Sequence, residues 1–414
     1  MNLEIDVFGD ESYYYYLSRF PEQYSIYHRD HPPMLYIAYH LFAEDISTFR
    51  IINIVIGSLI PCLVYIILGT YNIRERYRVL GASLPVFYTV FVRYSTIVFL
   101  DVLCAFFFLT AVYFYRRERW HLTDLFFGLS ILTKEVAIFG VATFMGYLII
   151  KRRSIRFVFP ATMLAVVVVM LILIPLRGWE SLWYGTTHGA FEEPFLFVIA
   201  PVFLPLLGVL IYRRYYVEAL FFAIYPLVFL TYHVTADWYS ILPLSFNIVS
   251  IMIALNELHS FHLKKRMYVK YALLVFFMLA IAFSSFNQAV ATRYFIDHKP
   301  SQLREVTQFV AKNCNGRKAA IIDSFWGYSL YPFGTYLNVS DNTYTGYNFT
   351  EKYYSSLINK TGLAVIGTLR GGEMNQKIRG ALLQMYENNI VFRNANYTMI
   401  DLTYTRPINR SRNP

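Results

Sequence analysis

The sequence predicts a mainly α-helical protein that crosses a membrane many times and carries a small α/β domain at its C-terminal end. Hydrophobic residues make up 56% of the 414 residues and charged residues only 15%, whereas a soluble domain carries about a quarter charged residues. The mean hydropathy is +0.40. The hydrophobic residues gather in blocks close to the ~20 residues that cross a bilayer. Short basic clusters separate these blocks, and the region after residue 291 changes to a charged, Asn-rich and Gly-rich composition.

The apolar blocks predict about ten transmembrane helices between residues 47 and 291. Two pairs of blocks are so closely spaced that they predict short tilted or re-entrant helices: 79–93 with 95–115, and 123–135 with 136–150. The expected spans are 47–70, 79–93, 95–115, 123–135, 136–150, 156–176, 194–212, 217–235, 239–258 and 271–291.

Basic clusters occupy alternate connections between these blocks. They are Arg74–Arg78, Arg116–Arg119, Lys151–Arg153, Arg213-Arg214 and Lys264–Arg266. Because Lys and Arg are enriched in cytoplasmic loops, these five connections are expected to face the cytoplasm. Residues 1–46 and 292–414 then face outward. The same pattern accounts for the net charge of +10. The positive charge therefore does not indicate nucleic-acid binding, and we exclude nucleic acid as a partner.

Residues 292–414 are predicted to form a small extracytoplasmic α/β domain. Short apolar strands alternate with amphipathic helices. The expected helices are Ser301–Asn313, Glu351–Asn359 and Asn375–Asn388, and the expected strands are Ala319–Ile322, Leu363–Gly367 and Tyr397–Leu402. Five N-x-S/T sequons fall in this region and none before residue 291, which supports the outward orientation. They are Asn338, Asn348, Asn359, Asn396 and Asn409.

Ionisable residues cluster on the outward side of the predicted membrane. An acidic pair and a tyrosine run, Asp10-Glu11-Ser12 with Tyr13–Tyr16, precede His31-Pro32-Pro33 in the N-terminal loop of residues 1–46. Arg93, Asp101 and Lys134 lie at or just inside the outward ends of later spans. A charged residue at membrane depth costs roughly 2.5–3.5 kcal/mol on insertion scales. Asp101 and Lys134 are therefore expected to have a role.

Structural explanations remain open for each of these residues taken singly. Asp10 suits the N-cap of a Tyr-rich helix, and His31-Pro32-Pro33 suits a turn that starts a helix. Asp101 with Arg93 or Lys134 suits a structural ion pair within the membrane. The histidines at 188 and 233 have no ligand spacing, so no cofactor is predicted and a divalent metal ion stays an open alternative.

The order of these motifs resembles the GT-C integral-membrane glycosyltransferases, in particular the protein O-mannosyltransferase-like branch. That family's first outer loop reads Asp-Glu-x-Tyr-Tyr followed by His-Pro-Pro, as residues 10–16 and 30–34 do here. The similarity continues through Phe49-Arg50, Phe99-Leu100-Asp101 and the Gly128–Glu135 turn, which ends in Thr133-Lys134-Glu135. It covers about residues 8–150. The family normally has a transmembrane helix before the acidic loop. We expect such a helix to be missing from this chain, and the alternative is that the hydrophilic N-terminal tail crosses the membrane by itself.

The resemblance implies a GT-C-like bundle that moves one sugar from a polyprenyl (dolichyl-type) phosphate donor to an acceptor hydroxyl, with inversion. By the family pattern Asp10 is the general base and Glu11 binds donor or acceptor. Lys134, Arg93 and, more weakly, Arg177 stabilise the lipid phosphate, while Asp101, His31 and Tyr14 position donor or acceptor. The sugar is expected to be a mannose-type hexose, and the acceptor a glycan, lipid or protein.

Two other classes of function remain as alternatives. A transporter or flippase for a lipid-linked or anionic solute would use Asp101 and Lys134 as pathway residues. Such a protein needs no outward acidic loop, and the chain shows no repeated Gly/Pro-broken helices. A membrane scaffold that presents a glycosylated outer domain would tolerate changes of any of these carboxylates.

Overall fold

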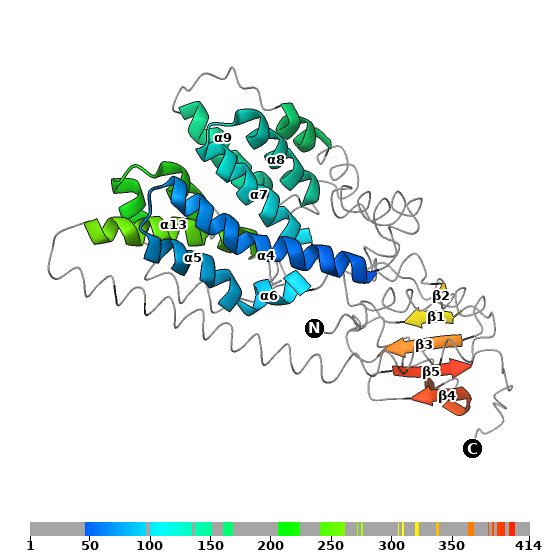
Figure 1. Cartoon of the computed structure of the whole chain (residues 1–414). Coiled ribbons are helices and arrows are strands. Elements are labelled where there is room, and N and C mark those ends of the chain that lie inside the picture. Colours follow the sequence, from blue (N-terminus) through cyan, green and yellow to red (C-terminus); the bar gives the residue numbers. More distant parts are fainter. Residues whose placement is uncertain are drawn as a thin grey trace. The chain divides into compact units, whose positions relative to one another are not determined.

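The chain divides into two compact units. The helical unit is His28–Ala291, and the sheet unit combines Met1–Tyr27 with Thr292–Pro414. The computed structural model describes residues 46–96, 100–134, 137–150, 160–168, 206–223 and 241–260 of the helical unit. In the sheet unit it describes residues 319–322, 337–338, 363–367, 387–393 and 397–401, and a few single residues are described besides. Each unit is considered by itself (Figure 1).

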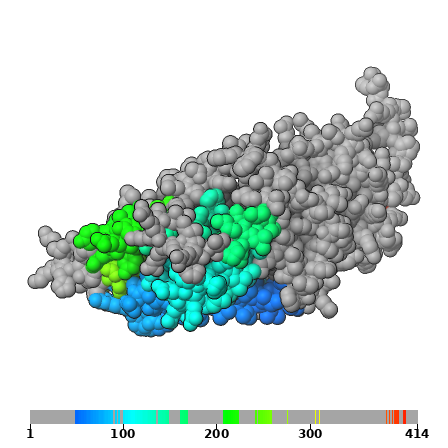
Figure 2. Space-filling model, turned by 90° about the horizontal axis from the view of Figure 1, so that it is seen from above, coloured from blue at the N-terminus to red at the C-terminus, as the bar shows by residue number. Residues whose placement is uncertain are grey.

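The helical unit is built from short helices joined by tight turns. In chain order they are α4 (Ile46–Thr70), α5 (Glu75–Phe87), α6 (Thr89–Thr96), α7 (Leu100–Arg116), α8 (Trp120–Thr133), α9 (Ala137–Ile150), helical segments at 160–168, 206–212 and 216–223, and α13 (Ile241–Ser260). Helix α7 packs against α4, α6, α8 and α13, and Figure 1 shows it between α4 and α8. The described helices form one closely packed block in Figure 2.

Five phenylalanine rings from five helices form the centre of this block. Phe108 of α7 lies 5.4 Å from Phe127 of α8 and 5.4 Å from Phe221 of segment 216–223, measured between ring centroids. Phe144 of α9 and Phe246 of α13 meet Phe108 edge-on at 5.9 and 6.0 Å. Gly140 admits this packing, because a Cβ there would lie 2.7 Å from the Phe108 ring. The aromatic cluster therefore fixes how α7, α8, α9 and α13 approach one another.

Three helix-to-helix turns share one C-cap geometry. In each, a non-glycine residue has positive φ: Asn72 (55°), Glu118 (55°) and Arg214 (64°). The next residue donates its N–H to the carbonyl five positions back, as in Arg119 to Phe114 at 3.0 Å and Tyr215 to Leu210 at 2.8 Å. This is the Schellman motif, which usually has glycine at the left-handed position. The same motif thus closes the α4–α5, α7–α8 and 206–223 hairpins.

Replacing Arg214 by glycine is expected to stabilise the protein by about 0.5–1 kcal/mol, because glycine adopts positive φ without a Cβ penalty. Thermal unfolding in a detergent without net charge measures the effect. Asn72→Gly is the matched comparison and should change stability less, because asparagine tolerates this conformation. Destabilisation by Arg214→Gly would contradict the assignment of backbone strain to this turn.

An aspartate of α8 caps a helix that begins much later in the chain. Asp124 is buried and accepts the N–H groups of Ala161 and Thr162, both at 2.9 Å. These N–H groups have no partner inside the segment at 160–168, because they belong to its first turn. Pro160, which has no N–H, precedes them. The cap joins segment 160–168 to α8.

The structure corrects the expected boundaries of two spans. Residues 79–93 are not one helix: α5 starts at Glu75 and ends at Phe87, after which Tyr88 is extended and the short α6 begins. Pro85 lies inside α5 and weakens its last turns, because it has no N–H to donate to the preceding turn. The span expected at 95–115 corresponds to α7, which begins at Leu100. The helices expected at 47–70, 123–135, 136–150 and 239–258 agree with α4, α8, α9 and α13 to within a few residues.

One helix in the described part of the chain is long and apolar enough to cross a membrane. It is Thr48–Thr70, and shorter apolar helices cover Ala137–Leu148 and Leu244–Leu258. Large aliphatic side chains of α4 are exposed on one face, among them Ile51 at 48% and Val55 at 54%. The predicted mainly helical architecture is confirmed, and the total of about ten spans stays a prediction.

The sheet unit contains a mixed five-stranded sheet with the order β2-β1-β3-β5-β4. The strands are β1 (Ala319–Ile322), β2 (Leu337–Asn338), β3 (Leu363–Gly367), β4 (Ile390–Arg393) and β5 (Tyr397–Asp401). Strand β1 pairs in parallel with β2 and β3, whereas β5 pairs antiparallel with β3 and β4. Strands β1, β3 and β5 coincide with expected strands, apart from the last residue of β5. Strands β2 and β4 were not expected.

Candidate active site

The described part of the predicted site consists of Asp101 and Lys134. Five predicted site residues lie outside the described residues: Asp10, Glu11, Tyr14, His31 and Arg177. Arg93 lies on α6, where only its backbone is described. The structure therefore brings together one pair of the predicted residues, and the roles of the others stay predictions.

Asp101 and Lys134 form a buried, bidentate ion pair. The Lys134 Nζ atom lies 2.7 Å from Oδ1 and 2.6 Å from Oδ2 of Asp101. Their side chains are 1% and 2% exposed, respectively. Charge-assisted hydrogen bonds of this length are about twice as strong as neutral ones. Of the two partners that the sequence left open for Asp101, the structure shows Lys134.

Local structure favours each charge where it stands. Asp101 lies in the first turn of α7, and Lys134 is the C-cap of α8. A helix is partially positive at its N-terminus and partially negative at its C-terminus, so both placements are stabilising. The backbone of Lys134 is extended, with φ −153° and ψ 131°. Helix α8 thus ends directly before Lys134, the residue that supplies the ammonium group of the ion pair.

The antiparallel register of α7 and α8 brings the pair together. One turn further along, the Ser130 hydroxyl donates to the Cys104 carbonyl at 3.1 Å, and the Cys104 thiol lies 3.6 Å from the Ser130 carbonyl. Both residues are fully buried. The Phe108–Phe127 ring contact continues the same register. These contacts and the turn at residues 116–119 fix the height at which Lys134 meets Asp101.

Asp101 lies at the end of the helical unit opposite to the Schellman turns. Arg116, at the C-terminal end of α7, donates to the carbonyl of Thr70 at the C-terminal end of α4, at 3.1 Å. Helices α4 and α7 therefore run in the same direction, and their N-terminal ends share one side. Asn53 of α4 donates to the carbonyl of Tyr94 at 2.8 Å, which ties the end of α6 to this side. Arg93 directly precedes Tyr94.

Arg50 is a buried charge that the sequence reading did not place among the site residues. It lies in the second turn of α4 and is 2% exposed. Asn53, one turn later, is 5% exposed. The available signal was an arginine at the start of a strongly apolar span, a position where charge is costly. With Arg50, the described charged groups Asp101, Lys134 and Arg50 on this side carry a net positive charge.

The described residues contain no group of three or more His, Cys, Asp or Glu side chains that could hold a metal ion. What they offer is a neutral Asp–Lys pair with a further buried cation on the same side. Such a site suits an anionic group, because hydrogen bonds and positive charge inside a low-dielectric bundle are stronger than in water.

Comparisons with known proteins give a family match over part of the chain and a structural match over nearly all of it. The model of the dolichyl-phosphate-mannose-protein mannosyltransferase family matches residues 30–179. That range includes His31, Arg93, Asp101, Lys134 and Arg177, and it begins after Asp10, Glu11 and Tyr14. No curated protein sequence matches the chain.

The solved structures that resemble the chain include ArnT from Cupriavidus metallidurans. ArnT bound to undecaprenyl phosphate is similar with a TM-score of 0.59 and 14% sequence identity, over 97% of this chain and 95% of the ArnT chain. Apo ArnT is similar with a TM-score of 0.54 and 14% identity, over 96% and 95% of the two chains. At this identity the likeness establishes the fold. The family match and the ArnT fold together confirm the resemblance of this chain to the GT-C integral-membrane glycosyltransferases of the protein O-mannosyltransferase-like branch.

Proposed function

We propose that this protein transfers a single sugar from a polyprenyl-phosphate donor to an acceptor hydroxyl on the outer face of a membrane. The observation that carries the proposal is the buried Asp101–Lys134 ion pair. Both residues lie within residues 30–179, the range that the mannosyltransferase family model matches. The ArnT structure was solved with undecaprenyl phosphate, which supports a polyprenyl phosphate as the lipid carrier. We infer a mannose-type hexose from the family match.

The proposed reaction is one displacement at the anomeric carbon. Asp10 takes the proton of the acceptor hydroxyl while that oxygen bonds to the anomeric carbon from the side opposite the phosphate. The bond between the anomeric carbon and the phosphate oxygen breaks, and its electron pair remains on the polyprenyl phosphate. Attack opposite to the leaving group inverts the anomeric configuration. Glu11, Tyr14 and His31 are assigned to holding donor or acceptor.

The leaving phosphate gains negative charge, so the site must supply cations. Lys134, Arg93 and Arg177 are assigned to this role. The carboxylate of Asp101 holds the Lys134 ammonium group in place through two hydrogen bonds and compensates its charge inside the bundle. Asp101 thus acts on the phosphate through Lys134.

Membranes that contain the protein, incubated with radiolabelled polyprenyl-phosphate sugars, test the proposal. We expect label to appear covalently bound to an endogenous glycan, lipid or protein. Membranes that contain the Asp10→Asn variant are the control. Movement of the label across the bilayer without any covalent product would instead favour a transporter or flippase.

Sidedness is a separate prediction with its own measurement. With the natural cysteines replaced, single cysteines at Ser12, Gly185 and Ser411 are expected to react with a membrane-impermeant reagent from outside. Cysteines at Arg117 and Arg152 should react only after lysis, because the basic connections face the cytoplasm. Labelling at Arg117 in intact cells, or protection of Ser12, would put the acidic loop on the wrong side for this reaction.

A further inference from the structure

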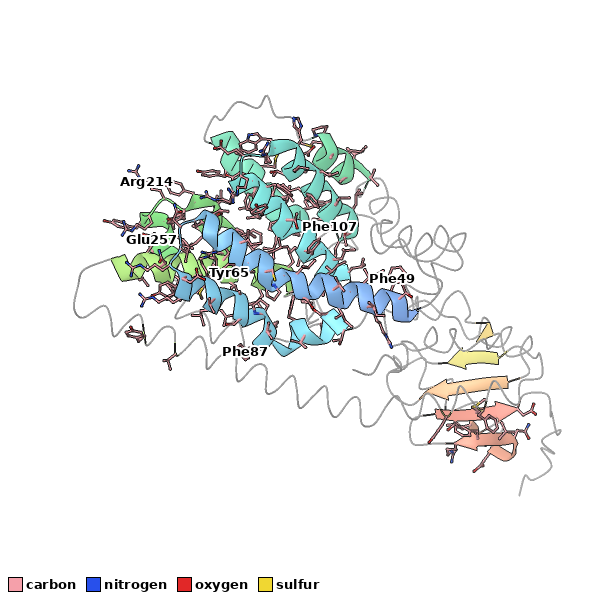
Figure 3. All side chains as sticks on the ribbon, viewed as in Figure 1. Phe49, Tyr65, Phe87, Phe107, Arg214 and Glu257 are labelled. Carbon is pink, nitrogen blue, oxygen red and sulfur yellow. The ribbon has the colours of Figure 1, made fainter. Side chains whose placement is uncertain are left out.

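The three Schellman turns meet at one end of the helical unit. We call residues 71–74, 116–119 and 213–215 the turn face. Arg116 donates to the Thr70 carbonyl at 3.1 Å, and the rings of Tyr71 and Tyr215 lie 6.2 Å apart. The N–H of Arg74 donates to Asn256 of α13 at 3.3 Å. Figure 3 shows Arg214 and Glu257 at the same end, far from Phe49 at the start of α4.

Three carboxylates near the turn face are bonded to groups of the protein itself. Glu75 accepts from Tyr65 at 2.5 Å and from Arg78 at 3.0 Å. Glu257 pairs with Arg213 at 3.1 Å. Their negative charges are therefore already compensated within the helical unit.

A third carboxylate, Glu218, is 4% exposed and accepts a hydrogen bond from the Tyr71 hydroxyl. Burial raises the pKa of the Tyr71 phenol well above its usual range, which keeps this donor protonated. The Arg116 guanidinium group lies 3.9 Å from the centroid of the Tyr71 ring. Glu218 is thus also directed into the protein.

Arginines of the same turns are exposed to solvent. The exposed arginines of the described turns and of the first turn of α5 are Arg74, Arg76, Arg116, Arg117, Arg119 and Arg214. Tyrosine rings lie beside two of these arginines. The guanidinium carbon of Arg76 is 5.0 Å from the centroid of the Tyr77 ring, and that of Arg117 is 5.6 Å from the centroid of the Tyr113 ring. Glu118 is an exposed carboxylate of the same turns. Even with Glu118 counted, the exposed guanidinium groups leave a surplus of positive charge on the turn face and the adjoining first turn of α5.

We propose that the turn face binds the headgroups of anionic phospholipids. Clusters of four to eight Lys or Arg residues beside a membrane helix attract anionic lipids, at about 1 kcal/mol per residue. The exposed aliphatic side chains of α4, including Leu59 at 43% and Ile66 at 43%, give the acyl chains of such a lipid an apolar surface leading to the turns. Tyrosine suits the same depth, because its ring is apolar and its hydroxyl is polar. The inference concerns the end opposite to Asp101 and Lys134, so it does not depend on the proposed transfer reaction.

The test measures which lipids stay bound to the purified protein. The protein is extracted from membranes made of equal parts of phosphatidylcholine and phosphatidylglycerol, and native mass spectrometry gives the ratio of the two lipids that remain. We expect phosphatidylglycerol to be enriched. A variant with Arg74→Gln, Arg119→Gln and Arg214→Gln removes one cation from each turn. It should reduce the enrichment by about fivefold per arginine, the ratio that corresponds to about 1 kcal/mol.

Two matched controls accompany this variant. The corresponding Arg→Lys triple variant keeps the charge and should keep the enrichment. Arg393→Gln removes an exposed charge from β4 of the sheet unit and should have no effect. Equal amounts of the two lipids on the wild-type protein, or unchanged enrichment in the glutamine variant, would overturn the proposal.

If the glutamine variant does not fold, the salt dependence of lipid binding to the wild-type protein tests the proposal instead. Raising the salt from about 0.1 M to about 1 M shortens the Debye length from about 10 Å to about 3 Å. Enrichment on the wild-type protein should then fall steeply. Enrichment that withstands this change would show that the turn face does not bind lipid through its charge.

Discussion

Replacing Asp10 by asparagine is expected to reduce sugar transfer by about 10²–10⁴-fold, the usual contribution of a general base. Asparagine has nearly the same shape but cannot accept the proton of the acceptor hydroxyl. Expression and donor binding should be retained, because the carboxylate is assigned to the acceptor. The measurement is the initial rate of label transfer from polyprenyl-phosphate sugar, with binding of polyprenyl phosphate measured separately.

Glu11→Gln is the matched control for the Asp10 change, since it removes one charge from the neighbouring residue of the same loop. It should be milder and should act mainly on the apparent affinity for donor or acceptor. A rate for Asp10→Asn within a few-fold of wild type would remove Asp10 from the mechanism. The N-cap explanation would then be preferred for the acidic pair.

Replacing Lys134 by methionine is expected to impair both stability and turnover. Methionine leaves the Asp101 carboxylate, 1% exposed, without the ammonium group that now lies 2.6 Å away. Breaking a buried ion pair from one side costs about 3–5 kcal/mol. Lys134→Arg keeps the charge and should weaken donor binding less than methionine does, although its planar group cannot reproduce the geometry of the ammonium group.

The double variant Asp101→Asn with Lys134→Met separates structure from chemistry. It removes both charges, so thermal unfolding should show much of the lost stability restored. Transfer should stay low, because the cation assigned to the leaving phosphate is still missing. If the double variant is stable and transfers sugar at the wild-type rate, Lys134 and Asp101 are a structural ion pair only.

The sequence predicted the helices whose ends carry clear signals. Helices α4, α8, α9 and α13 are apolar blocks bounded by polar residues, and hydropathy located each of them. The prediction failed at Tyr88, because the apolar composition continues through this break. Pro85 was a visible signal close to it. A proline by itself does not predict where a helix ends, since α4 continues through Pro61.

The missed features depend on contacts between residues far apart in the chain. Asp124 caps a helix that starts at residue 160, and nothing near Asp124 indicates this. Glu118 and Arg214 adopt positive φ without glycine, so a search for glycine caps does not find their turns. The sequence showed Arg50 as a charge in an apolar block and as part of the Phe49-Arg50 motif of the resemblance, but neither signal gave it a role in the site. Its burial and its place on the side of Asp101 came from the packing of α4 against α6 and α7.

By itself the sequence determined the membrane-like helical class, the alternation of basic connections and the motif order that resembles GT-C glycosyltransferases. These properties are carried by composition and by residues close together in the chain. Only the tertiary structure decided that Lys134 pairs with Asp101, and that the three Schellman turns form one basic face. The physical reason is that helix register and side-chain burial depend on packing between separate segments. Here the Phe108 cluster and the Cys104–Ser130 hydrogen bond set that register.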